Sequence, residues 1–239
     1  MKNKLQGISI LIVTVALALL HLSFISGKST VKATATVQPV VTDTSFSLYD
    51  SLHLDSSGLS REAFDYATKG WQKLVDQGMV VNSSVLAIAD FSQPSSNKRL
   101  YILDLKNYKL LFHTLVAHGR NSGKDMAVAF SNKMSSNMSS PGFYVTGDTY
   151  SGKHGYSLKL NGVEKGINDN AYNRAIVVHG ADYVNETLAA KQGYIGRSLG
   201  CPAISTREAQ PIINTIRNNS CFFIYEPGSD YTQHSALLS

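Results

Sequence analysis

The chain has 239 residues, of which 43% are hydrophobic and 16% are charged, a composition that excludes an intrinsically disordered chain and suits one globular domain with accessory segments. The 22 Lys and Arg against 17 Asp and Glu give a formal charge of +5, which would normally favour a nucleic acid or an anionic surface as partner. Four of these lysines and no acidic residue lie in the first 35 residues, so the rest carries 18 basic against 17 acidic side chains. We therefore predict no nucleic-acid partner.

The first segment, residues 1–35, has the features of an export signal. Met1–Lys4 is basic, Ile8–Ile25 is an apolar run broken only by Ser, Thr and His, and Ala33 and Ala35 form an A-x-A cleavage pattern. A cleaved signal peptide is favoured, because the polar interruptions lower the apolarity of the run. The alternative is an uncleaved membrane anchor, since the run is nearly long enough to span a bilayer. Either interpretation predicts an exported, periplasmic or envelope-associated protein that contacts the membrane only through this segment, if it is uncleaved.

The next two segments differ in their patterning. Residues 36–58 are rich in Ser, Thr and Val and are predicted to form a flexible stem. Residues 59–82 are predicted to form a helical extension, because Ser60 can begin and Gly78 can end a helix over Leu59–Gln77 whose apolar residues share one face. Such a helix needs a surface to pack on, so we expect packing support rather than a separate binding module.

Residues 83–228 are predicted to form a mainly β, sandwich-like domain. Short runs rich in Val, Ile, Leu, Tyr and Phe alternate here with turn residues, and many short strands with little helix between them favour an antiparallel sandwich or barrel. The strand candidates are Val85–Ala89, Leu100–Leu105, Lys109–His118, Gly142–Thr146, Tyr156–Leu160, Ala175–His179 and Cys221–Tyr225. One short C-terminal helix is predicted over Thr206–Asn218, and residues 229–239 are predicted to be an unanchored tail.

One histidine is placed where a base could act. His179 ends the apolar run Ala175–Val178, and Gly180 follows it. A strand thus delivers an imidazole to a sheet edge where the chain can turn. The alternative is a strand-end histidine that only hydrogen bonds to a backbone carbonyl.

A cysteine that could act as a nucleophile follows in the sequence. Cys201 lies between Gly200 and Pro202, in a turn that can aim the thiol outward and leave the Gly200 and Cys201 amides free to form an oxyanion hole. Arg197 could favour the thiolate or hold a substrate carboxylate, or form a surface ion pair. Ser198 could hydrogen bond within the turn or to substrate.

The second cysteine and the histidines suggest other chemistry only weakly. Cys221 lies in an apolar run and is most simply a buried side chain, although in an oxidising compartment a Cys201–Cys221 disulfide is the default alternative. The sequence has no C-x-x-C or H-E-x-x-H pattern, so we predict no metal site and no cofactor.

Together these motifs resemble a known family. His179-Gly180 and Ser198-Leu199-Gly200-Cys201 are similar to the H-G and S-x-G-C signature of the L,D-transpeptidases (YkuD-type), and Ser139–Thr146 resembles that family's T-P-x-G-x-F strand. Fuller strings around His118, His179 and Cys201 look like the subgroup of murein L,D-transpeptidase catalytic domain proteins. Two departures are Leu199, where many members have His, and Pro202-Ala203-Ile204, where Arg or Asn usually follows the Cys.

The resemblance implies a β-sandwich-like enzyme that acts on peptidoglycan stem peptides, both as donor and as acceptor. Cys201 would form a thioester with the third residue of the stem, His179 would transfer protons, and the Gly180 carbonyl would orient the imidazole. The Gly200 and Cys201 amides would bind the oxyanion. Five more residues are candidates for the substrate site. Four of them could line the cleft or equally be loop residues: His118, Arg120, His154 and Asn168. The fifth, Arg174, could reach a substrate carboxylate or merely flank the strand.

Two other functions remain open from the sequence. A Cys-dependent murein carboxypeptidase or amidase would use the same thiol and base but pass the acyl group to water. A noncatalytic wall-binding protein would instead hold Cys201 and Cys221 in a disulfide.

Overall fold

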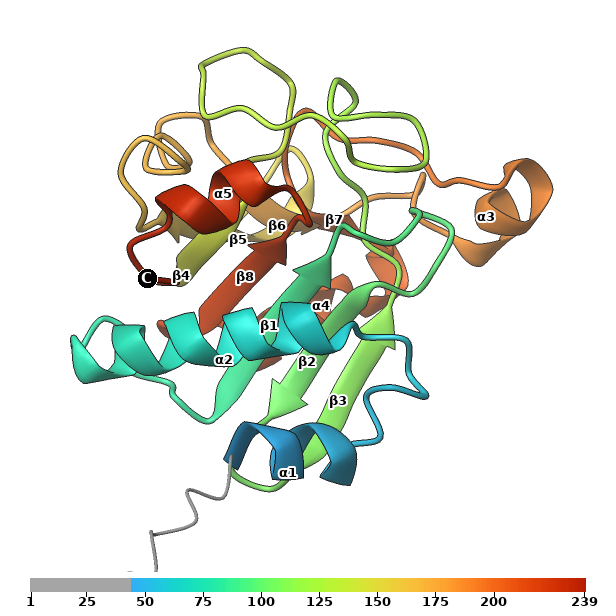
Figure 1. Cartoon of the computed structure of the whole chain (residues 1–239). Coiled ribbons are helices and arrows are strands. Elements are labelled where there is room, and N and C mark those ends of the chain that lie inside the picture. Colours follow the sequence, from blue (N-terminus) through green and yellow to red (C-terminus); the bar gives the residue numbers. More distant parts are fainter. Residues whose placement is uncertain (1–43) are drawn as a thin grey trace, which may run out of the picture. The chain divides into compact units, whose positions relative to one another are not determined.

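The protein is described by a computed structural model that covers residues 44–239 (Figure 1). Its helices are α1 (Thr44–Ser51), α2 (Arg61–Asp76), α3 (Glu186–Gln192), α4 (Thr206–Ile216) and α5 (Ser229–His234). Its strands are β1 (Val85–Asp90), β2 (Leu100–Asp104), β3 (Lys109–Thr114), β4 (Gly142–Gly152), β5 (Gly155–Gly162), β6 (Val177–Gly180), β7 (Ala203–Ile204) and β8 (Cys221–Tyr225). The predicted export signal and the beginning of the predicted stem lie outside the described residues. Within residues 44–239, no helix is long and apolar enough to cross a membrane.

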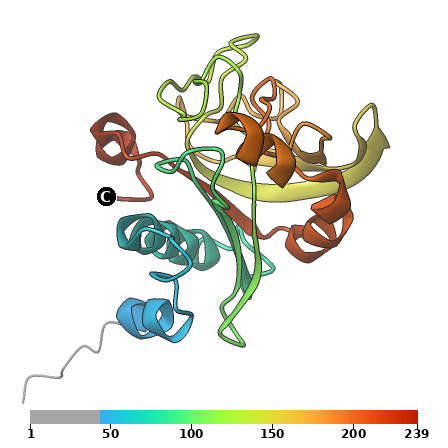
Figure 2. The same ribbon diagram turned by 90° about the vertical axis from the view of Figure 1, so that its right-hand side faces the viewer.

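The eight strands form one sheet in the order β3-β2-β1-β8-β4-β5-β6-β7, so the predicted mainly β fold is confirmed. Most neighbours are antiparallel, as predicted, but β1 pairs with β8 and β6 pairs with β7 in parallel. The register of β4 and β5 shifts between Thr146 and Thr149, which fits the curvature of this long hairpin in Figure 2. β1 and β8 can pair in parallel because a long connection separates them in the sequence. This connection includes strands β2 to β7 and helix α4.

Both faces of the central strands are buried. In β1, Leu86 and Ile88 pack toward α1, α2 and the C-terminal residues, whereas Ala87 and Ala89 belong to a second cluster with the isoleucines of α4. This double burial explains why β1 and β8 read as continuous apolar runs. Helix α2 begins where Ser60 accepts a hydrogen bond from the Ala63 amide, and it packs on β1 and β8, as expected for packing support.

Two segments differ from the sequence prediction. Residues 44–58, predicted as flexible stem, form α1 and a turn in which Leu54 is fully buried. Residues 229–239, predicted as an unanchored tail, form α5 and place Leu237 and Leu238 in the core, and Lys69 Nζ donates to the Leu238 carbonyl at 2.5 Å. In both segments, a few apolar side chains pack against the α2 side of the sheet. Short sequence windows of mixed composition do not reveal this packing.

Candidate active site

The imidazole of His179 lies near the end of β6 and is almost fully buried, with 3% of its surface exposed. Its Nδ1 atom lies 2.9 Å from the Gly180 carbonyl oxygen. Because a carbonyl only accepts, Nδ1 carries the hydrogen and Nε2 keeps its lone pair. Burial lowers the pKa of His179, the Gly180 contact opposes this shift, and the nearby His154 adds to it. The ring is therefore held in the neutral form that a general base requires.

The loop that carries Cys201 is held between two segments of the chain. On one side β7 pairs with β6, with Ala203 opposite His179. On the other side Ala117 bridges to Ala203, and Gly119 bridges to Ser198. The thiol of Cys201 thus has a defined position at the edge of the sheet.

The thiol itself is partly buried beside the start of β6. Cys201 Sγ donates to the Ala175 carbonyl oxygen at 3.7 Å. Burial raises the pKa of the Cys201 thiol, although the Val177 backbone amide and the charge of Arg174 oppose that shift. A raised thiol pKa beside a histidine of lowered pKa describes a neutral pair rather than a preformed thiolate and imidazolium.

The pairing of β6 with β7 brings the Cys201 loop to the strand that carries His179. Ala203, which is opposite His179, begins β7 two residues after Cys201, and the Cys201 thiol contacts the backbone at and just before the start of β6. In the resting geometry the thiol is bonded to Ala175 and not to His179. A hydrogen bond from the thiol to His179 would have to replace the one to Ala175, and catalytic hydrogen bonds often form only in the substrate-bound enzyme.

The predicted oxyanion hole is only partly available. The Gly200 amide donates to Ser198 Oγ at 3.0 Å, and the Ser198 hydroxyl donates to the Cys201 carbonyl at 2.6 Å. The prediction of a free Gly200 donor is thus wrong for this conformation, because the serine side chain closes the turn and uses that amide. Ser198 is 4% exposed and serves the turn rather than a substrate site.

Two of the predicted cleft residues do lie at this site. The ring of His154, from the turn between β4 and β5, stacks on His179 with 4.4 Å between centroids. Arg174 lies close enough to Cys201 to lower the pKa of its thiol, but its guanidinium already donates to the carbonyls of Ser131 and Met138. Arg174 therefore holds a loop beside the thiol, and its contact with a substrate carboxylate stays a prediction.

Two other predicted cleft residues are fully buried and have structural partners. His118 Nδ1 accepts from Arg99 Nη2 at 2.7 Å, and burial, together with the Arg99 charge, lowers the His118 pKa to about 4. The Asn168 side chain donates to the Pro141 and Phe143 carbonyls at 3.0 Å. Their polar atoms are thus used within the fold, and a substrate-binding role for these two residues stays a prediction.

The remaining candidates lie on the surface. Arg197 Nη1 donates to the Gly123 carbonyl at 3.1 Å, and the Arg120 side chain is exposed. Both thiols are free: Cys221 lies in β8 within the cluster below α2, whereas Cys201 packs on the opposite cluster. The predicted disulfide alternative is therefore not formed, because the sheet separates the two sulfur atoms. Within residues 44–239, no group of three or more His, Cys, Asp or Glu side chains could hold a metal ion.

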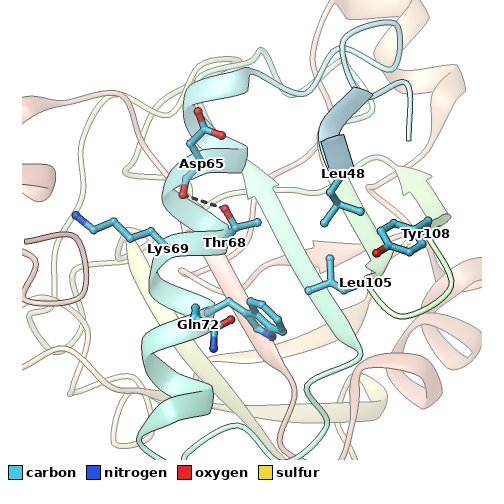
Figure 3. A pocket seen from close by; sticks show the side chains of 8 residues that line it. Leu48, Asp65, Thr68, Lys69, Gln72, Leu105 and Tyr108 are labelled. Atoms are coloured by element: carbon cyan, nitrogen blue, oxygen red, sulfur yellow. Dashed lines mark hydrogen bonds between the residues drawn. The ribbon is translucent and has the colours of Figure 1, made fainter. Parts of the chain in front are cut away.

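Two cavities differ in their relation to these residues. One, of about 530 Å³, lies between α1, α2 and the turn after β2 and includes none of the predicted site residues (Figure 3). The other, of about 230 Å³, is lined by Ala175 and Val177, the two residues whose backbones contact the thiol. Its remaining walls include Tyr150, Lys159 and Tyr172. These three residues were not among those predicted for the site from the sequence. Side chains alternate along β5, however, so Lys159 points to the same side of the sheet as Ser157.

Comparison with known proteins identifies similar sequences and structures. A family profile described as the L,D-transpeptidase catalytic domain matches residues 55–225. No curated protein matches. Solved structures that match part of the chain include the L,D-transpeptidase from Mycobacterium smegmatis, at 13% identity over 60% of this chain and 59% of that one, with a TM-score of 0.37. L,D-transpeptidase 3 from Mycobacterium tuberculosis matches at 13% identity over 60% and 61%, with a TM-score of 0.38. The helical cell shape determining protein Pgp2 from Campylobacter jejuni matches at 12% identity over 65% and 53%, with a TM-score of 0.40.

Proposed function

This chain belongs to the L,D-transpeptidase catalytic domain family, and we propose that it is an exported cysteine L,D-transpeptidase that acts on peptidoglycan stem tetrapeptides. The observation that supports the proposal is that β7, which begins two residues after Cys201, pairs with β6 beside His179, whose Nδ1 contact with Gly180 leaves Nε2 able to accept a proton. The chain spans about three fifths of the length of the similar mycobacterial structures. The activity, the substrates and export through residues 1–35 are all parts of this proposal.

In the acylation step, the Cys201 side chain turns from Ala175 toward His179, and His179 Nε2 accepts the thiol proton. The sulfur then attacks the carbonyl carbon of the third stem residue. Collapse of the tetrahedral intermediate breaks the peptide bond to the terminal D-Ala, whose amine receives the proton from His179. The products of this step are a thioester on Cys201 and free D-Ala.

In the second step, the acyl group passes to an acceptor. An amine of a neighbouring stem attacks the thioester, its proton goes to His179, and the Cys201 thiol is restored. The product is a 3-3 cross-link. If water attacks instead, the same residues perform a carboxypeptidase reaction.

Proton transfer to a neutral base fits the electrostatics of the site. Burial raises the Cys201 pKa and lowers the His179 pKa, so charge separation is unfavourable until the substrate arrives. The oxyanion then forms beside the Cys201 amide. The Gly200 amide can join it only if it leaves Ser198 Oγ.

The experiment that tests this function is incubation of the protein with a disaccharide-tetrapeptide, followed by mass spectrometry. The expected products show loss of D-Ala and formation of dimers, and Cys201→Ala is expected to lose both. Cys221→Ala is the matched control, since it removes the other thiol at a distance from the site. Equal activity in wild type and Cys201→Ala would contradict the proposed nucleophile.

The same experiment separates the related functions. Loss of D-Ala without any dimer would indicate that water is the acceptor. Thiol counting on protein purified without reductant tests the noncatalytic alternative, which requires one disulfide. Mass analysis of the protein recovered from the cell envelope tests export, because cleavage after Ala35 removes a defined mass.

A further inference from the structure

The sheet face that carries His179 has two rows of side chains. The pairings of β4 with β5, β5 with β6 and β6 with β7 place Tyr150, Ser157, His179 and Ala203 in one row. Residues two positions away on β5 and β6 form the second row, in which Lys159 is opposite Val177. Side chains of one row point to the same side of a sheet.

Lys159 therefore lies on the same face as His179. It lines the cavity of about 230 Å³ together with Ala175 and Val177, whose backbones contact the Cys201 thiol. The cavity thus lies next to the thiol. A peptide bound with its scissile carbonyl at Cys201 would extend a neighbouring substituent into this cavity.

The charge of Lys159 is not neutralised within the fold. None of the ion pairs found among residues 44–239 involves Lys159. Its Nζ instead lies 5.6 Å from the centre of the Tyr172 ring, and its side chain is only partly exposed. A partly desolvated ammonium group between aromatic walls attracts an anion more strongly than an exposed lysine does.

The aromatic walls of the cavity leave room for such a group. The Tyr150 ring packs against Gly152, where an added Cβ would lie 2.6 Å from Tyr150 Cε2. This close approach keeps the ring beside its own strand. Tyr150 and Tyr172 are 39% and 59% exposed, so both rings can lose further exposed surface when a ligand enters.

From this arrangement we propose that the cavity is a carboxylate subsite for the donor peptide, in which Lys159 pairs with a carboxylate close to the scissile bond. The inference rests on the proposed function, because it assumes that the donor is a stem peptide. Two carboxylates of such a peptide have the required chemistry: the distal carboxylate of a dicarboxylic diamino acid at the third position, and the C-terminal carboxylate of the residue that leaves. Both would form a charge-assisted hydrogen bond with the Lys159 ammonium.

Three donor peptides distinguish these sources. The first carries both carboxylates, the second has a carboxamide at the distal position, and the third has a carboxamide at the C-terminus. The measurement is the rate of acylation of Cys201 by each peptide, followed by intact mass. Wild type is expected to prefer the first peptide about tenfold over one of the two amides, the difference expected when a charged hydrogen bond is lost.

Variants assign the preference to Lys159. Lys159→Met is expected to abolish it, and Lys159→Arg, which keeps the charge, is expected to retain it. Lys106→Met is the matched control, because it removes an exposed lysine from the turn after β2 and should leave the preference unchanged. Urea midpoints of all variants show that each is folded.

Two results would overturn the inference: a wild type that does not distinguish any of the three peptides, or a preference that survives in Lys159→Met. Failure of the proposed function is a different outcome, in which no peptide acylates wild type. In that case the affinities of the three peptides for Cys201→Ala, measured by calorimetry, still test the subsite. Equal affinities would reject it, and weaker binding of one amide that disappears when Lys159→Met is added would support it.

Discussion

Substitution of Gly200 by alanine should destabilise the protein strongly, because two independent costs coincide at this residue. Gly200 has φ +126, a conformation that costs an L-residue about 1–3 kcal/mol. An added Cβ would also lie 2.8 Å from the Met138 carbonyl oxygen and 3.1 Å from Arg174 Nη2. These atoms cannot easily move apart, since Arg174 donates to Met138, and such overpacking costs about 1–3 kcal/mol. The sum predicts a loss of about 2–6 kcal/mol in the free energy of unfolding.

The matched control is Gly166→Ala. Gly166 also has a positive φ, +79, but its added Cβ would meet no atom within 4 Å, so only the conformational cost of about 1–2 kcal/mol remains. Urea unfolding of wild type and both variants measures the difference, provided that the m-value is unchanged. Equal losses in the two variants would refute the reasoning, because contact with the segment at Met138 would then contribute nothing.

Three further predictions concern titration. His154→Phe keeps a ring on His179 but removes the charge that lowers the His179 pKa, so the His179 pKa should rise; an unchanged value in an NMR titration would contradict this. Arg174→Gln removes a charge that lowers the Cys201 pKa, so the pH midpoint of Cys201 alkylation by iodoacetamide should move upward. Burial raises the pKa of Glu164 above 4.5, so the folded state binds this proton more tightly than the unfolded state does. That contribution to stability is present below pH 4.5 and is lost as the pH rises through the raised pKa. Glu164→Gln should therefore make the urea midpoint less dependent on pH in this range.

Much of the sheet could be predicted because most strands are marked by their own residues. Cys221–Tyr225 is found at the predicted bounds, and Val85–Ala89 extends by one residue. The two-residue strand β7 was missed, since it forms only through pairing with β6. Helix α1 was missed for a similar reason, because its stability depends on contacts such as the one between Tyr49 and Phe64.

The site was predictable as far as local chain geometry determines it. The glycine after His179 and the turn around Cys201 are local features, and the pairing of β6 with β7 brings the two segments together. Whether a polar atom is free depends on distant neighbours. His118 meets Arg99 across the fold, and the sequence alone contains no signal for that pairing.

The position of β8 has a consequence for how the chain is made. This strand is hydrogen-bonded between β1 and β4, although every other described strand precedes it in the sequence. During synthesis, β1 therefore exposes an unpaired edge until residues 221–225 have emerged. A growing chain of this topology is incompletely folded and aggregation-prone until that strand is in place.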